Sequence, residues 1–332
     1  MITMNIKIPS QGLTKLDYLN PELHSLNIDK NRISNINSLS ALTNLQELKI
    51  WENCINDIRE LSCLSRLKTL YLHSNQITNI DALSNLTHLE NLNLSHNQID
   101  NVESISSLTK LEMLWILGNN ITNIDSLSQL TRLKKLHTNF NSLRKIDIIS
   151  SMTRLESLTF SSDFISDINC VSQLTKLRYL SANCCNIQDL TPLSHLIQLN
   201  ILDLRANCFE NINVLSKLTN LKEIDISYNG INNYDPLLHL TRLEVITNKN
   251  LYEYELYKAD LDTLINRNKR MKWQNVHPMF LEYCLAIAPL NLPVLIQLEI
   301  FNWLSYDNHR KNKWKIAKSV KDIWNKKLYE DF

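Results

Sequence analysis

Apolar and polar positions along the chain recur with a period of 22 residues. Apolar residues predominate at the first, fourth, sixth, eleventh, fourteenth, seventeenth and twentieth positions of each segment, and most other positions are polar. One segment of this length cannot bury its own apolar face, so the period predicts stacked segments that share a continuous core. Ten copies follow one another without an insertion or deletion, and copies 1 to 10 begin at Leu23, Leu45, Leu67, Leu89, Leu111, Leu133, Leu155, Leu177, Leu199 and Leu221.

Two spacings within each copy predict its elements. Positions 4 and 6 alternate with polar neighbours, as Leu70 and Leu72 do, which predicts a short strand with one buried face. Positions 11, 14, 17 and 20 lie three residues apart, which is the spacing of 3₁₀ turns, and the copy has no room for a full α-helix. We therefore expect an α/β solenoid with a parallel sheet on the concave face and 3₁₀ turns on the convex face.

Position 9 carries a polar residue beside the apolar pattern. It is asparagine in eight copies, while Asp163 and Cys185 occupy it in copies 7 and 8. A buried polar side chain is tolerated when it is hydrogen-bonded, so we expect each asparagine to turn inward and bond the backbone of the bend after the strand. These residues are Asn31, Asn53, Asn75, Asn97, Asn119, Asn141, Asn207 and Asn229.

With this leucine pattern, the chain resembles the leucine-rich repeat family from about residue 13 to residue 250. It is most similar to the short 22-residue class, which is found in regulators of protein phosphatase 1 and in bacterial internalins. The resemblance implies a protein-interaction scaffold rather than an enzyme. Regulation of a phosphatase is an alternative that rests on the repeat class alone.

The repeat pattern also predicts the domain boundaries. Residues 1–22 form an N-terminal cap, in which Leu13, Leu16 and Leu19 are a degenerate half-repeat. The ten copies span 23–242. A degenerate repeat and connector follow at 243–275, and 276–332 has a helical apolar period, which predicts a small all-α segment.

Composition excludes several classes of function. The net charge is +1, which gives no general signal for binding polyanions. The three glycines, Gly12, Gly118 and Gly230, cannot form a glycine-rich phosphate loop. Seven cysteines without a C-x-x-C pair predict neither a disulfide framework nor a zinc ribbon, so we expect no cofactor and no metal. Residues 1–11 lack the apolar run of a signal peptide, and we expect a monomeric cytoplasmic protein.

The candidate functional surface is the concave face. Strand positions 3, 5, 7 and 8 point away from the core, and in copies 2 to 6 they carry large rings that the fold does not need. Aromatic side chains with polar neighbours are typical of the energetic centres of protein interfaces. We therefore predict a protein partner on this face, bound by Trp51, Tyr71, His73, Asn93, Trp115, His137, Phe140 and Tyr179.

Other sites on the repeats receive less support. His73 and His96 lie on neighbouring predicted strands, but no carboxylate or thiol joins them as a metal ligand. Position 22 is basic in six copies, as in Arg66 and Lys110, which predicts either a solvated edge or a surface for RNA or phosphate. We expect the solvated edge and no nucleic-acid partner. Catalytic residues are not predicted.

The stretch from Leu292 to Leu328 is similar to an F-box. It begins with leucine and proline, continues in an apolar rhythm and ends near Val320 and Trp324. The resemblance implies that the chain recruits a substrate to a cullin ubiquitin ligase, whereas a helical cap on the solenoid is the structural alternative. The interruptions at Glu282, Pro289 and Glu299 argue against a membrane span. In the adaptor case the residues facing Skp1 would be Leu292, Pro293, Ile296, Ile300, Phe301 and Leu304.

Such C-terminal segments also occur in repeat proteins of large DNA viruses. Heavy use of asparagine, isoleucine and lysine indicates an AT-rich genome, which suits that origin. In a viral protein the expected location is the host cytoplasm.

Overall fold

The computed structural model describes residues 4–16, 19–162 and 164–247, and in them the strands form one sheet in sequence order. Every neighbouring pair of strands is parallel, and copies pair position by position, as Tyr71 pairs with Asn93 and Asn93 with Trp115. The strands are β1 (Met4–Lys7), β2 (Leu23–Asn27), β3 (Glu47–Lys49), β4 (Thr69–Tyr71), β5 (Asn91–Asn93), β6 (Met113–Trp115), β7 (Lys135–His137), β8 (Ser157–Phe160), β9 (Tyr179–Ala182), β10 (Ile201–Asp203), β11 (Glu223–Asp225) and β12 (Val245–Thr247).

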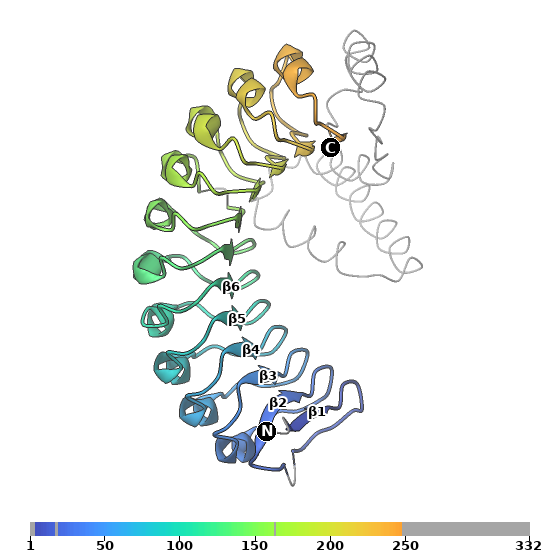
Figure 1. The fold of residues 1–332 in the computed structure, drawn as a ribbon, viewed down its shortest axis with the longest axis vertical. Helices are drawn as coiled ribbons and strands as arrows, with labels where there is room; N and C mark the ends of the chain where they lie inside the picture. Colours follow the sequence, from blue (N-terminus) through green and yellow to red (C-terminus); the bar gives the residue numbers. More distant parts are fainter. Residues whose placement is uncertain (1–3, 17–18, 163, 248–332) are drawn as a thin grey trace, which may run out of the picture. The chain divides into compact units, whose positions relative to one another are not determined.

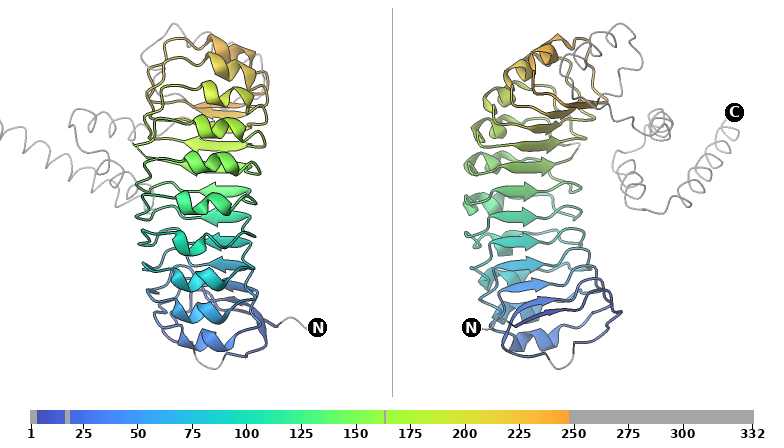
Figure 2. Two further views of the ribbon diagram at one scale, coloured as in Figure 1. Left: turned by 90° about the vertical axis from the view of Figure 1, so that its left-hand side faces the viewer. Right: turned by 45° about the vertical axis from the view of Figure 1, so that its right-hand side comes forward.

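A 3₁₀ turn follows the strand in each copy and lies on the opposite side of the repeats (Figure 1). Viewed from that side, the turns stack in one column (Figure 2, left). The predicted solenoid, with a parallel sheet and 3₁₀ turns, is therefore confirmed. The turns are η1 (Asn37–Ala41), η2 (Arg59–Cys63), η3 (Asp81–Asn85), η4 (Glu103–Ile105), η5 (Asp125–Gln129), η6 (Asp147–Ser151), η7 (Asn169–Gln173), η8 (Thr191–His195), η9 (Asn213–Lys217) and η10 (Asp235–His239).

The core lies between the sheet and the column of turns. The seven predicted apolar positions supply it, and the apolar residues there form one continuous buried cluster through the copies. Leu16 of the N-terminal segment is buried against this cluster, and Leu13 and Leu19 are partly buried against it. At the other end, β12 adds Ile246 to the same cluster. Each copy therefore depends on its neighbours for burial, as expected for a solenoid.

The asparagines of position 9 turn inward and join adjacent copies. Asn97 is representative: its Oδ1 accepts the backbone N–H of Ile77 in the preceding copy at 3.0 Å. Its Nδ2 donates to the carbonyl oxygens of Leu72 in that copy and of Leu94 in its own, at 3.1 and 3.0 Å. The predicted role of position 9 is confirmed, and these bonds satisfy backbone groups that are closed to water.

The ladder of asparagines is interrupted in copies 7 and 8. Position 9 of copy 7 lies outside the described residues. In copy 8 the Cys185 Sγ accepts the backbone N–H of Ser162 at 3.4 Å and donates to the carbonyl of Asn183 at 3.4 Å. Strands β8 and β9 of these copies are one residue longer than β7 and β10, and they pair along four residues. The interruption thus coincides with a more extended strand ladder.

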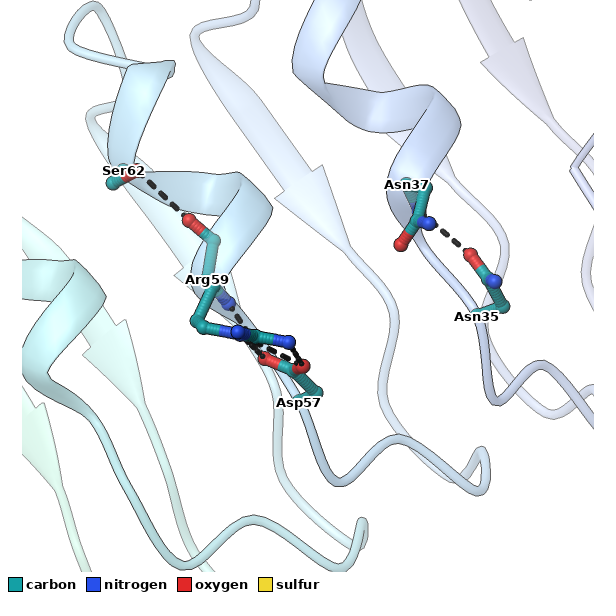
Figure 3. A network of polar contacts seen from close by, with 5 residues as sticks. All are labelled: Asn35, Asn37, Asp57, Arg59 and Ser62. Carbon is teal, nitrogen blue, oxygen red and sulfur yellow. Dashed lines mark hydrogen bonds and ion pairs between the residues drawn. The ribbon is translucent and has the colours of Figure 1, made fainter.

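On the convex side, position 13 lies just before the 3₁₀ turn of each copy. In nine copies its Asn or Asp side chain accepts the backbone N–H of the residue two positions later, as Asn35 does from Asn37 at 2.9 Å. Figure 3 shows this bond together with that of Asp57, whose carboxylate also pairs with the Arg59 guanidinium at 2.7 Å. Ser62 closes the same turn by donating to the carbonyl of Arg59. These side chains therefore start the turns by an Asx-type bond.

Candidate functional site

The concave face is formed by side chains at positions 3, 5 and 7, which point away from the core residues at positions 4 and 6. All eight residues predicted to bind a partner are half-buried. Most lie at or just after the ends of strands β3 to β7, whereas Tyr179 begins β9. The strands thus hold these side chains in fixed rows, spaced by the sheet at about 4.8 Å from one copy to the next.

Five of the predicted rings contact one another and form what we term the aromatic cluster: Trp51, Tyr71, His73, Trp115 and His137. The Trp51 and His73 rings stack with centroids 4.8 Å apart and planes at 12°. Trp115 meets Tyr71 and His137 edge to face, at centroid distances of 6.2 and 6.1 Å. The sequence predicted exposed rings, but in the structure each ring covers part of its neighbour. Such pairing restricts the rings before any partner arrives.

Lysines flank the cluster at its N-terminal end. The Lys30 Nζ lies 4.9 Å from the centre of the Trp51 ring, so Lys30 and His73 flank this ring from the preceding and the following copy. The Lys49 Nζ lies 5.6 Å from the Tyr71 ring and 2.7 Å from a carboxylate oxygen of Glu47. Hydrogen bonds from Lys49 and from Ser25 lower the pKa of Glu47. Paired lysine and glutamate side chains therefore border the rings at this end of the cluster.

The histidines of the cluster are neutral near pH 7. Burial lowers the pKa of His73 to about 4, with a further contribution from the charge of His96. Burial, with the nearby Lys135, also lowers the pKa of His137 to about 4. A protonated imidazole would be poorly solvated at either of these half-buried places, so the uncharged form is favoured. The two imidazoles thus act as polar aromatic surface rather than as cations.

His137 also forms a pair that the sequence did not single out. Its Nε2 lies 3.0 Å from the Ser157 Oγ on the next strand, as a base lies beside a nucleophile. An imidazole with a pKa near 4 is, however, a weak base at neutral pH, and efficient proton transfer needs a base whose pKa is close to the working pH. The pair is better suited to orienting the imidazole than to activating the serine.

Asn93 has a structural contact that its sequence position did not predict. Its Oδ1 accepts the backbone N–H of Ser95 at 3.0 Å, two residues later. Asn27, Asp203 and Asp225 occupy the same position and bond the N–H two residues later in the same way. An Asn or Asp at position 5 therefore shapes the bend after the strand as well as facing the concave side. The amide of Asn93 retains its Nδ2 donors for a partner.

Phe140 and Tyr179 take part in none of these ring pairs of the described residues. Phe140 follows β7 at position 8 with φ of 58°, and its N–H donates to the Ser161 Oγ at 3.0 Å. Tyr179 lies on β9, where burial and the charges of Asp203 and Glu223 raise the pKa of its phenol. The predicted residues thus belong to two regions, an aromatic one and one beside carboxylates.

The second region is what we term the acidic end, formed by Asp203, Glu223 and Asp225 on β10 and β11. Asp203 and Asp225 are direct partners in the strand register. Burial raises the pKa of Asp225, and the charge of Asp203 raises it further. The repeat places these residues on the concave face, with Asp203 and Asp225 one period apart, but the sequence analysis selected large rings and did not single out the carboxylates.

The described residues contain no group of three or more His, Cys, Asp or Glu side chains arranged to hold a metal ion. Among the helices of that same portion of the chain, none is long and apolar enough to cross a bilayer. The six residues predicted to face Skp1, from Leu292 to Leu304, lie outside the described residues.

Comparisons with known proteins agree with the architecture. Residues 21–77 match a leucine-rich repeat model, and residues 65–107 and 87–130 match a model of two leucine-rich repeat copies. A search of curated proteins finds no match to this chain.

Solved structures with the same fold come from bacteria and plants. An internalin (inlF) of Listeria monocytogenes is 29% identical, with 75% of this chain and 74% of that chain covered and a TM-score of 0.72. A leucine-rich repeat protein of Leptospira interrogans is 21% identical, with 79% and 81% covered and a TM-score of 0.62.

A plant example was solved with a ligand. The ectodomain of the Arabidopsis thaliana receptor kinase GASSHO1/SCHENGEN3, in complex with Casparian strip integrity factor 2, is 21% identical, with a TM-score of 0.58. It covers 69% of this chain, which spans only 30% of that ectodomain. Together with the repeat models, the ladder of asparagines and the stacked 3₁₀ turns, these similarities show that the chain is a leucine-rich repeat protein.

Proposed function

We propose that this chain is a non-enzymatic scaffold that binds a protein partner on the concave face of copies 2 to 6. The observation that carries the proposal is the aromatic cluster. Its five rings come from strands β3, β4, β6 and β7 and the bends that follow them, at positions that the core does not use. The repeat fold does not require rings at these outward positions, so binding of a partner best explains their presence.

The physical state of the cluster suits binding. Half-buried rings that already pack together have little rotational freedom left to lose, which lowers the entropic cost of forming an interface. Neutral imidazoles at His73 and His137 can be covered without removing a charge from water. The rim of lysine and glutamate side chains remains at the edge, as in typical interfaces.

The related folds support a role in interaction. Internalins and receptor ectodomains share the architecture, and the plant ectodomain was solved in complex with a separate factor. The weak basicity of His137 supports the non-enzymatic part of the proposal, because the Ser157 hydroxyl beside it has no effective base at neutral pH.

A pull-down with the full chain tests the proposal. The wild type and the double variant Trp51→Ala/Trp115→Ala are compared as baits in lysate of the source cell, with mass spectrometry of the captured proteins. Interface centres of this kind contribute about 2 kcal/mol or more each, so we expect at least tenfold less of the specific partner with the double variant. Phe164→Ala is the matched control, because Phe164 is an aromatic residue that is 49% exposed at position 10, outside the cluster.

The pull-down has one result that supports the proposal and one that contradicts it. Loss of a partner with the double variant but not with Phe164→Ala supports the proposal, provided that both variants unfold at urea concentrations close to that of the wild type. If the double variant retains every partner of the wild type, the aromatic cluster is not the contact surface.

A further inference from the structure

The concave face changes its chemistry along the repeats. The aromatic cluster covers copies 2 to 6 and the acidic end covers copies 9 and 10. Between them, copies 7 and 8 carry mostly small hydroxyl side chains on β8, β9 and the bend after β8, namely Ser157, Thr159, Ser161 and Ser181. Tyr179, which begins β9, is the exception. A partner lying along the face would therefore meet the aromatic cluster first, then small hydroxyl side chains with Tyr179 among them, and then carboxylates.

The acidic end carries more negative than positive charge at its concave positions. Asp203 already accepts hydrogen bonds from the Ser181 hydroxyl at 3.0 Å and from the Asn183 amide at 2.8 Å, and Asp225 accepts one from the N–H of Ser227. These neutral donors orient the carboxylates but do not cancel their charge. Burial is the main cause of the raised pKa of Asp225, and the charge of Asp203, its partner in the strand register, raises it further, while Arg205 counteracts this repulsion. A cation at this place would relieve that repulsion.

A second observation lies in the aromatic region. Ser95 is 2% exposed, and its hydroxyl has no hydrogen-bond partner among the described residues. The Nδ1 of His73, on the neighbouring copy, likewise lacks one among them. Buried polar groups are nearly always bonded, so two such atoms on adjacent copies indicate a place where a ligand group or a water molecule completes the structure.

We infer that the partner presents an extended peptide segment along the concave face, with a large apolar side chain on the aromatic cluster and a lysine or arginine at the acidic end. This inference rests on the proposed function. Trp115 on β6 and Asp203 on β10 are separated by four strand spacings, or about 19 Å. An extended chain advances about 3.3 Å per residue, so the two anchors are about six residues apart.

The charge distribution favours this segment over an acidic one. Two lysines at the aromatic region are paired with carboxylates, Lys49 with Glu47 at 2.7 Å and Lys30 with Glu52 at 3.9 Å, while Lys135 has no ion-pair partner among the described residues. The aromatic region therefore offers an acidic peptide one uncompensated lysine. At the acidic end, in contrast, the concave positions 3, 5, 7 and 8 of copies 9 and 10 carry three carboxylates and one arginine, Arg205. Basic side chains are therefore attracted to that end and acidic ones are repelled.

The repeats themselves suggest a variant that removes this charge without disturbing the fold. Asn27 and Asn93 occupy the same position as Asp203 and Asp225 and make the same bond to the backbone N–H two residues later. Asp203→Asn/Asp225→Asn should therefore keep that bend, although Ser181 and Asn183 lose Oδ2 of Asp203 as an acceptor. The matched control is Asp167→Asn/Asp189→Asn, which removes two carboxylates from neighbouring copies on the convex side. There too, Asn211 makes the equivalent bond.

The experiment selects random 12-residue peptides, displayed on phage, against the immobilised full-length chain. We expect enriched peptides with an aromatic or large aliphatic residue and a lysine or arginine five to seven positions apart. Synthetic copies should bind Asp203→Asn/Asp225→Asn at least tenfold more weakly than the wild type or the convex control. Raising the salt concentration from about 50 to 500 mM should weaken binding to the wild type more than to this variant.

The result that overturns the inference differs from the one that overturns the proposed function. Peptides that are lost with Trp51→Ala/Trp115→Ala, but carry no basic residue or bind the acidic-end variant unchanged, refute the inference and leave the proposed surface standing. A selection that yields no peptide sensitive to either double variant refutes the extended-segment inference, while the pull-down still decides the proposed function. If selected peptides depend on the acidic end alone, the two-anchor inference is wrong as well.

Discussion

The convex and concave faces of the repeats differ in how uniform they are. On the convex side, position 13 accepts the same backbone N–H in nine copies, whether the residue is Asn or Asp. On the concave side, position 5 is Tyr71 in copy 3, Asn93 in copy 4, Trp115 in copy 5 and Asp203 in copy 9. The fold tolerates all of these, because an outward strand position has no obligatory contact.

This difference indicates which residues serve the fold and which serve a partner. A residue type that repeats with the same hydrogen bond in each copy is accounted for by the scaffold. A residue whose type changes between copies, and which contacts other residues that do not repeat, is not accounted for by the scaffold. Substitutions on the two faces test this division.

Leu114 and Trp115 are neighbours on β6 that point to opposite faces. Leu114 is fully buried in the core, so Leu114→Ala should lower the free energy of unfolding by about 2–5 kcal/mol. Trp115 is half-buried with two edge-to-face contacts, so Trp115→Ala should cost only about 1 kcal/mol although it removes more atoms. Urea denaturation followed by circular dichroism measures both. Equal losses would show that the aromatic cluster is part of the scaffold.

Asn97 tests the ladder at position 9. Asn97→Ala leaves the buried N–H of Ile77 and the carbonyls of Leu72 and Leu94 without this partner, and should cost about 3 kcal/mol. Gln98→Ala, at the exposed next position, should change the stability by less than about 0.5 kcal/mol in the same urea titration. A small loss for Asn97→Ala would mean that the backbone of the bend is satisfied without the ladder.

The concave histidines predict a dependence of stability on pH. In the folded chain the pKa of His73 and of His137 is about 4, below the ordinary 6.5, so the unfolded chain takes up protons first as the pH falls. The contribution of these groups to the free energy of unfolding therefore falls as the pH drops from about 6.5 towards 4. His73→Gln/His137→Gln should flatten this part of the urea-midpoint profile. An unchanged slope would contradict the burial of the neutral imidazoles.

The caps of the convex turns should have the smallest effect. Asn101→Ala removes one exposed bond, to the N–H of Glu103, and should cost about 0.5–1 kcal/mol. Copy 6 carries Lys145 at this position, so Lys145→Asn should stabilise the chain by a similar amount. It also removes the exposed ion pair with Asp125 at 3.7 Å, which contributes little. Thermal unfolding of the two variants should shift in opposite directions, and shifts in the same direction would refute the capping role.

Much of this architecture could be predicted because the same pattern of apolar and polar positions recurs in ten copies. The alternation at positions 4 and 6 predicted the strands, and the spacing of three predicted the 3₁₀ turns. Position 9 was correctly assigned to inward hydrogen bonding. One of two physical requirements determines each of these positions: the burial of an apolar side chain, or the hydrogen bonding of the backbone in the bend.

The concave site was predicted only in part, for a geometric reason. The sequence shows that Trp51 and His73 face outward, but their stacking depends on side-chain rotation across two strands. Asp203 and Asp225 are 22 residues apart, so the period predicts that they are neighbours, but their bonds to Ser181, Asn183 and Ser227 depend on side-chain geometry that the period does not give. The bond from Asn93 to the N–H of Ser95 was missed because strand alternation treats position 5 only as an outward position.

Site-specific photo-crosslinking shows directly which face of the repeats contacts a partner. The photoreactive residue p-benzoylphenylalanine replaces Tyr71 on the concave face or Ile197, which is 54% exposed at position 21, outside the concave positions. Both full-length proteins are irradiated in lysate of the source cell, and covalent adducts are resolved by electrophoresis and mass spectrometry. Our account predicts a specific protein adduct from position 71 and none from position 197. An adduct formed from position 197 and not from position 71 would contradict it.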